Sequence, residues 1–241
     1  MKPSQIFSFS HPGKRKSQED SFYISYDSRF MAICDGVGGS LDGGLASREI
    51  IGYLSNLYES QSINKNSISI RQMIKEASHL LNHSVITSGV NISTTLALVY
   101  FGDENIILSH IGDSRIFHIK KFSDEYWVSK DHSFVQELYD AGILQTEFDM
   151  KVHPMKSRIT KALTSYSHLE NDDIELKSIS KLDKGDLIIL CSDGVLETFT
   201  NDSFVDHFRN EKHELQILAK ALESYCKQYS RDNNTCIIAE V

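Results

Sequence analysis

The chain has 241 residues, with 33 acidic and 25 basic side chains and a formal net charge of −8. This acidic balance argues against nucleic acid or an anionic membrane surface as the main partner, and it suits a site for cations. No apolar run reaches the roughly 18 residues that cross a bilayer, and the first residues show no signal-peptide pattern. The four cysteines form no CxxC pair, as expected of reduced thiols. We therefore expect a single cytoplasmic domain over residues 1–241.

The first half of the chain predicts short strands and then two helices. Alternating or continuous apolar runs predict strands at 6–10, 21–26 and 30–34. Apolar residues then recur at helical spacing over 45–60 and again over 70–88. Two amphipathic helices should therefore follow one another directly.

The second half returns to strands. Strand patterns occur at 94–101, 105–111, 115–120 and 126–129. Their connections are too short for crossover helices, so neighbouring strands should be antiparallel. A short helix at 133–141 precedes a segment without clear period, 142–167, which we expect to be a flap that is functional or mobile. The remaining elements predicted are a strand from 187, helices at 202–209 and 215–229, and a strand at 235–241. We expect the apolar face of the helix at 215–229, including Tyr225 and Tyr229, to be core.

Runs of strands separated by pairs of helices favour an α+β layered domain. Within it, three apolar runs end at an aspartate beside a glycine: Asp35-Gly36, Gly112-Asp113 and Asp193-Gly194. Such a run predicts a buried strand that places the carboxylate at the rim of a sheet. Asp20 and Asp232 also fall at predicted junctions between strand and turn. Any one of these is more often a plain turn, but together they predict a carboxylate cluster at one end of a sheet.

Clustered carboxylates repel one another, and cations must offset several kcal/mol of repulsion and desolvation. Oxygen ligands beside a glycine suit Mg²⁺ or Mn²⁺ better than Zn²⁺, which prefers histidine or cysteine. The sequence therefore predicts a magnesium or manganese site.

From about Ser8 to Val241 the chain resembles the metal-dependent type-2C protein serine/threonine phosphatases. Six motifs in the order and approximate spacing of that family carry the resemblance: Arg15-Lys16-Ser17-Gln18-Glu19-Asp20, Asp35-Gly36-Val37-Gly38-Gly39, Ser93-Thr94-Thr95, Gly112-Asp113-Ser114-Arg115, Ser192-Asp193-Gly194 and Asp232-Asn233-Asn234-Thr235. It implies an αββα four-layer sandwich of two mostly antiparallel β-sheets flanked by helix pairs.

The resemblance also implies a binuclear centre of Mn²⁺ or Mg²⁺. Asp35 would bridge both ions, the carbonyl of Gly36 would bind one of them, and Asp193 and Asp232 would bind the other. Asp113, with Asp193, would contribute to a possible third ion.

Three further residues receive roles from the same resemblance. Glu19 and Asp20 would hold metal-bound waters, and Arg15 would bind the substrate phosphate. Two metal ions lower the pKa of a shared water and orient it for in-line attack on phosphorus, so no covalent phosphoenzyme is needed. A cysteine-nucleophile loop would require arginine six residues after its cysteine, and no cysteine here has one.

Four positions depart from the commonest family pattern. Gln18 and Ser157 stand where asparagine is usual, and Asn234 replaces an apolar residue. Val37 lies where animal members carry a histidine proposed as general acid. Val37 therefore indicates a bacterial-type enzyme and leaves protonation of the leaving group unassigned.

We expect an enzyme that hydrolyses phosphoserine and phosphothreonine in proteins, acts as a monomer and binds neither nucleic acid nor membranes. The alternative is a catalytically weak regulatory or binding module of the same fold, dedicated to one phosphoprotein partner. In the narrower case of an enzyme dedicated to one partner, the flap at 142–167 would carry the selectivity.

Overall fold

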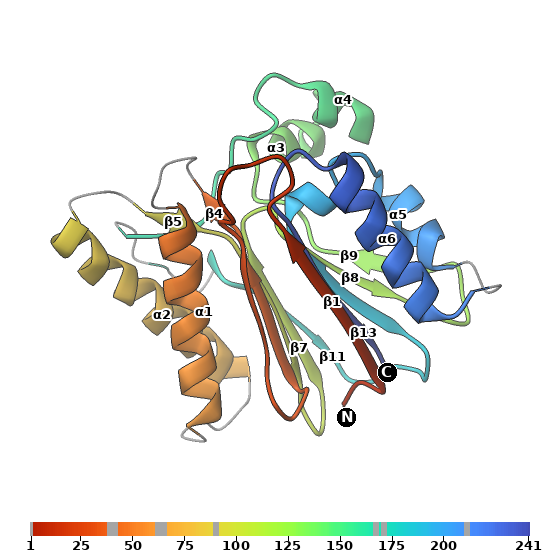
Figure 1. The fold of residues 1–241 in the computed structure, drawn as a ribbon, viewed down its shortest axis with the longest axis horizontal. Helices are drawn as coiled ribbons and strands as arrows, with labels where there is room; N and C mark the ends of the chain where they lie inside the picture. The colour runs from red at the N-terminus through yellow and green to blue at the C-terminus, as the bar shows by residue number, and fades with distance from the viewer. Residues whose placement is uncertain are drawn as a thin grey trace.

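The computed structural model describes residues 2–37, 43–60, 67–88, 92–165, 169, 173–209 and 213–241. Two antiparallel sheets lie face to face, and a pair of helices covers the outer side of each (Figure 1). This arrangement confirms the expected four-layer αββα sandwich. The predicted Gly38-Gly39 turn and residues 166–167 of the flap lie outside the described residues.

The first sheet has the strand order β11-β7-β6-β3-β2. Every pair of neighbours in it is antiparallel, including the strands at 96–101 and 106–111, for which the short connection predicted it. Its strands are β2 (Ser21–Ile24), β3 (Phe30–Cys34), β6 (Leu96–Phe101), β7 (Ile106–Ile111) and β11 (Glu175–Ile179). The strands at 106–111 and 115–119 are also closely connected but lie in different sheets.

The second sheet has the order β1-β13-β12-β8-β9 and is also antiparallel throughout. Its strands are β1 (Gln5–His11), β8 (Arg115–Ile119), β9 (Tyr126–Val128), β12 (Leu187–Cys191) and β13 (Asn234–Glu240). The first and last strands of the chain are therefore paired along their whole length, from Gln5 with Glu240 to His11 with Asn234.

The continuous apolar runs of β3 and β12 are explained by burial on both faces. In β3, Met31 and Ile33 point into the layer between the sheets, while Phe30 and Ala32 pack under the helices. In β12 the same alternation places Ile188 between the sheets and its neighbours under the second helix pair. A strand that is buried on both sides has no polar face to show in its sequence.

Two helix pairs form the outer layers. They are α1 (Gly43–Glu59) with α2 (Ser67–Ser88), and α5 (Asn201–Phe208) with α6 (Leu215–Tyr229). Leu218 and Leu222 of α6 are buried, as predicted, but Tyr225 and Tyr229 are 38% and 49% exposed. The expectation that the whole face of α6 is core was therefore wrong at its C-terminal end. None of the described helices is long and apolar enough to cross a membrane.

The remaining elements lie at one end of the sheets (Figure 1). A small antiparallel sheet is formed by β4 (Gly36–Val37), β5 (Ser93–Thr94) and β10 (Leu163–Thr164). Beside it lie α3 (Phe134–Asp140) and α4 (Glu147–Val152). The segment 142–167 was expected to lack clear structure, yet it contains α4 and β10. A capping box between Thr146 and Asp149 fixes the start of α4.

Candidate metal centre

The direction of the strands brings the predicted carboxylates to one end of the sandwich. Asp35 follows β3, and Asp193 follows β12 at the start of the short helix η2 (Asp193–Val195). Asp232 precedes β13, which is antiparallel to β12, so it reaches the same end. Asp113 lies in the turn from β7 to β8, and Asp20 directly precedes β2. The structure thus brings together all five aspartates that the sequence analysis selected.

Four of these aspartates line a cavity of about 130 Å³. Its described walls include the carboxylates of Glu19, Asp35, Asp113, Asp193 and Asp232, with Arg15 and Gly36 beside them. Asp20 is 5% exposed, and its Oδ2 accepts a hydrogen bond of 2.8 Å from Ser192 Oγ. Asp20 therefore belongs to the same centre from a deeper position.

Glycines allow the loops of the centre to approach one another closely. A Cβ on Gly194 would lie 2.0 Å from the carbonyl oxygen of Asn233. A Cβ on Gly13, which has φ +59°, would lie 2.1 Å from the carbonyl oxygen of Asp232. No residue with a side chain fits either contact without a backbone shift. The spacing between Asp193 and Asp232 therefore depends on glycine.

Asn233 holds the loop that carries Arg15 and Glu19. Its Nδ2 donates to the carbonyl oxygens of Pro12 at 3.0 Å and Ser17 at 2.9 Å, and its Oδ1 accepts from the Glu19 N–H at 2.8 Å. Asn233 lies within one of the six motifs, but the sequence predicts no role for it. Its only signal in the sequence is its place directly after Asp232.

Burial and mutual repulsion raise the pKa of the clustered acids. Burial is the main cause for Asp35 and Asp113, whose pKa values are raised well above the ordinary range, and neighbouring aspartates add to it. Burial and then Asp232 raise the pKa of Asp193 to about 6. Burial also raises the pKa of Asp20, although the Ser192 hydroxyl favours its ionised form. The centre is therefore electrostatically unfavourable without added positive charge.

Arg15 forms a two-pronged contact with one of these acids. Its Nε and Nη2 donate to Asp232 Oδ1 at 2.8 Å and Oδ2 at 2.6 Å, and the Arg15 side chain is 56% exposed. Arg15 thus lies at the cavity, as a phosphate-binding residue must. In this structure its guanidinium binds a predicted metal ligand, a pairing that the sequence did not predict.

The residues present fit divalent cations with oxygen ligands. Asp20 Oδ1 is buried and has no hydrogen-bond partner among the described residues. Five carboxylates line the cavity, and among its described lining residues Arg15 is the one cation. Carboxylate oxygens with a backbone carbonyl are a donor set suited to Mg²⁺ or Mn²⁺.

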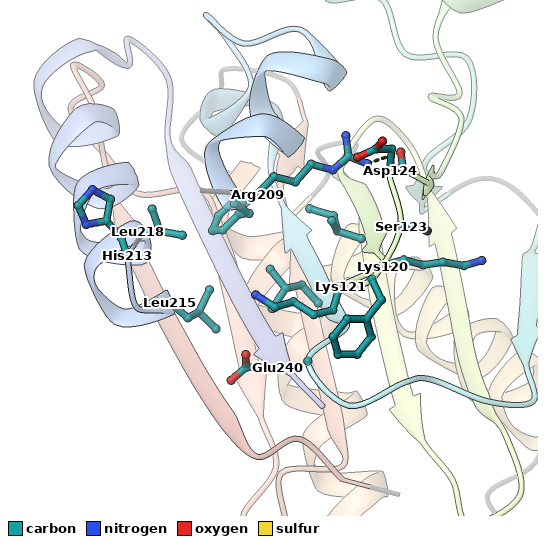
Figure 2. Close-up of a pocket in the computed structure, with 14 residues that line it drawn as sticks. Lys120, Lys121, Ser123, Asp124, Arg209, His213, Leu215, Leu218 and Glu240 are labelled. Atoms are coloured by element: carbon teal, nitrogen blue, oxygen red, sulfur yellow. Dashed lines mark hydrogen bonds between the residues drawn. The ribbon is translucent and has the colours of Figure 1, made fainter. Parts of the chain in front are cut away.

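A second cavity, of about 480 Å³, lies at the opposite end of the sandwich (Figure 2). It is bordered by the turn after β8 and by the start of α6, including Lys121, Leu215 and Leu218. Arg209 donates there to the carbonyl oxygen of Asp124, and Lys120 pairs with Glu125 at 2.5 Å. These paired charges do not resemble the acid cluster, so the smaller cavity is the candidate functional site.

The carboxylate cluster at one end of the αββα sandwich has the donor set of a divalent-cation site, and comparison with known proteins identifies the family. The family model for protein phosphatase 2C matches residues 10–223. The chain belongs to the protein phosphatase 2C family.

Two curated relatives of the chain are bacterial proteins that are named as phosphatases. The protein phosphatase PhpP of Streptococcus pneumoniae is 29% identical over 202 residues, covering 80% of this chain and 79% of PhpP. The serine/threonine protein phosphatase PstP of Mycobacterium tuberculosis is 26% identical over 230 residues, covering 94% of this chain. The chain spans only 43% of the length of PstP.

The fold is shared with a solved structure of the PstP catalytic domain in complex with two manganese ions. The two chains are 25% identical. The match covers 98% of this chain and 97% of the PstP chain, with a TM-score of 0.82.

Proposed function

We propose that the chain hydrolyses phosphoserine and phosphothreonine in proteins and requires Mn²⁺ or Mg²⁺. The observation that carries this proposal is the convergence of five carboxylates on one cavity of about 130 Å³, with Arg15 at its edge. Family membership supports the reaction class, and the two manganese ions of the PstP catalytic domain support the choice of cation. The cytoplasmic location and the monomeric state stay predictions.

The positions of these residues support the ligand roles that the family resemblance implies. Asp35 would bridge two cations, with the Gly36 carbonyl on one and Asp193 and Asp232 on the other. Asp113, which reaches the same cavity from the turn after β7, would serve with Asp193 for a third. Each of these residues lies within two residues of the end of a strand, so the sheets would restrict the movement of the ligands.

The remaining residues act on water and phosphate. Divalent cations, when bound, neutralise the phosphate dianion and lower the pKa of water, so that hydroxide is available near neutral pH. Glu19 and Asp20 would accept hydrogen bonds from ordered water and orient it. The planar guanidinium of Arg15 can bind two phosphoryl oxygens at once. Its exposed position allows it to turn from Asp232 toward the substrate.

Hydrolysis would then proceed by in-line displacement, in which water attacks phosphorus opposite the departing serine or threonine oxygen. All four cysteines are buried, which argues against a cysteine nucleophile. Val37 lines the cavity and has no proton to give, so the chain supplies no acid for the leaving group at that position.

The deciding experiment measures phosphate release from a phosphothreonine peptide with Mn²⁺, Mg²⁺ or chelator. Native protein should require added metal, and Asp193→Ala should lose activity by more than the roughly 10–100-fold typical of outer-shell changes. Asp103→Ala is the matched control, because Asp103 is exposed and pairs with Arg29 away from the centre. Absence of turnover by folded native protein that still binds Mn²⁺ would favour the alternative, a phosphoprotein-binding module.

A further inference from the structure

His132 lies between the turn that carries Asp113 and the returning end of the flap. Its backbone N–H donates to the carbonyl oxygen of Gly112 at 2.9 Å, and its own carbonyl oxygen accepts from the Thr160 N–H at 2.8 Å. Its ring adds a third bond, because Nδ1 accepts from the Gly112 N–H at 3.1 Å. Both backbone polar groups of Gly112 are therefore hydrogen bonded to His132. Nδ1 of the ring accepts from the Gly112 N–H in place of the backbone carbonyl oxygen that a paired strand would provide.

The ring of His132 belongs to a group that at first resembles a second metal site. It stacks on the buried His110, with centroids 4.8 Å apart and planes at 11°, and both Nε2 atoms lie about 4 Å from Glu175 Oε2, at 3.9 and 4.0 Å. The hydrogen bonds argue against a metal. A neutral His132 that accepts at Nδ1 carries its proton on Nε2, which faces Glu175. His110 Nε2 lies 2.7 Å from the Lys130 carbonyl oxygen and must donate to it.

The same environment keeps the His132 ring in its neutral form, which can accept a hydrogen bond at Nδ1. Burial, and then His110, lower the pKa of His132 to about 4. The imidazole is therefore neutral at physiological pH, and its Nδ1 lone pair is available to Gly112.

The Gly112 turn has little freedom apart from this bond. Gly112 is buried with φ +100°, and a Cβ there would lie 2.6 Å from Thr95 Cγ2. Ser114, on the far side of Asp113, bonds Thr95 Oγ1 through its hydroxyl at 2.7 Å. Thr95 thus fixes one side of the turn and His132 the other. Without Nδ1 the buried Gly112 N–H would lose its partner, which is costly enough to reorient the peptide.

We propose that His132 is a positioning residue for Asp113, acting through the Gly112 N–H to set the carboxylate for a divalent cation at the Asp113 and Asp193 side of the cavity. This rests on the proposed function for the identity of the cation. His132 acts without touching the cation, and through Thr160 it ties the flap to the same turn.

The test compares Mn²⁺ binding by the intact protein, measured without substrate from the free Mn²⁺ electron-spin-resonance signal. His132→Asn keeps an acceptor, because asparagine Oδ1 lies where histidine Nδ1 lies. His132→Leu removes it. His132→Leu should lower the affinity for the most weakly bound Mn²⁺ ion by about 10–100-fold, as outer-shell changes do. His132→Asn should bind that ion with an affinity close to that of native protein. His132→Gln moves the amide toward the Nε2 position and replaces the leucine variant if that variant does not fold.

His118→Leu is the matched control for a purely structural effect. His118 is also buried and hydrogen bonded, to Asp186 at 2.9 Å, but it lies in β8 toward the opposite end of the sandwich. It should lower the melting temperature without changing Mn²⁺ affinity.

Native affinity in His132→Leu would overturn the proposal, and so would a loss in His132→Asn as large as that in His132→Leu. A Zn²⁺ ion bound by native protein and released by His132→Asn would also overturn it, by showing that the ring is a ligand. Native protein that binds Mn²⁺ but fails to hydrolyse phosphopeptides would refute the proposed function. The expected order of the variants in Mn²⁺ affinity would not change.

Discussion

Replacing Asp193 by asparagine should make the metal-free protein more stable while abolishing its function. Burial and the neighbouring Asp232 raise the pKa of Asp193 to about 6. An unfolded aspartate titrates near about 3.9, and each pKa unit corresponds to about 1.4 kcal/mol, so ionised Asp193 costs the fold about 3 kcal/mol at pH 8. Asparagine removes that cost but loses some hydrogen bonding, which leaves an expected gain of about 2 kcal/mol.

The sign of the effect depends on pH. Because the pKa is raised in the folded state, the contribution of Asp193 to stability is complete below about pH 4 and is lost as the pH rises through about 6. In chelator at pH 8, Asp193→Asn should therefore melt about 4–8 °C above native protein, since 1 kcal/mol shifts a chain of this size by roughly 2–4 °C. Its advantage should shrink at pH 5.

Added Mn²⁺ separates this explanation from a general stabilising effect. Native protein should gain stability with Mn²⁺ at pH 8, while Asp193→Asn should gain far less because a ligand is missing. Asp103→Asn, at the exposed ion pair with Arg29, should show no such gain in chelator. Two results would refute the reasoning. One is an Asp193→Asn variant that melts below native protein in chelator at pH 8, and the other is an increase in melting temperature that is equal at pH 8 and pH 5.

Three further changes probe the positions of the ligands, the phosphate clamp and the flap. Gly194→Ala places a Cβ 2.0 Å from the Asn233 carbonyl, so melting temperature and Mn²⁺-dependent hydrolysis should both fall, and unchanged hydrolysis would contradict the required close approach. Arg15→Lys keeps the charge but loses the planar two-pronged geometry, so KM for a phosphopeptide should rise several-fold, more than kcat falls. Glu147 accepts from the N–H and Nδ2 of Asn201 at 3.0 and 2.6 Å. Glu147→Gln should therefore raise amide hydrogen exchange in α4 about tenfold while leaving β12 unchanged, and equal exchange in α4 would show that this contact does not hold the flap.

The central strands and the acid cluster were predictable because their signals are local. In β3 and β12, burial on both faces leaves an apolar run that ends sharply at Asp35 and at Asp193. The order of such runs indicates antiparallel pairing once the connections are too short for crossover helices. Such short connections join β6 to β7 and β8 to β9, but the strands beside Asp35, Asp193 and Asp232 are connected through helix pairs. The convergence of these aspartates was therefore predicted from their shared position beside glycine or asparagine at strand ends, and not from the connections.

The missed elements depend on contacts between distant parts of the chain. The helix α4 has six residues, too few for a clear period, and Lys151 stabilises it by donating to the carbonyl oxygens of Leu196 and Phe199. The strand β11 lies at the edge of its sheet, with no fully buried residue. Tyr225 falls on the apolar stripe of α6, but it packs against Phe199 at the surface. No window of the sequence contains these partners together.

The pairing of Arg15 with Asp232 links the two halves of the proposed chemistry. Asp232 is proposed to hold a cation and Arg15 to hold phosphate. In this structure, however, Arg15 donates hydrogen bonds of 2.6 and 2.8 Å to the two carboxylate oxygens of Asp232. A cation that takes Asp232 must displace the guanidinium, and the released guanidinium is then free for a phosphoryl group. Arg15 should therefore compete with the cation before it assists the substrate. Arg15→Ala should bind Mn²⁺ more tightly than native protein while hydrolysing phosphopeptides more slowly. Weaker or equal Mn²⁺ binding in that variant would show that the two residues do not exchange partners.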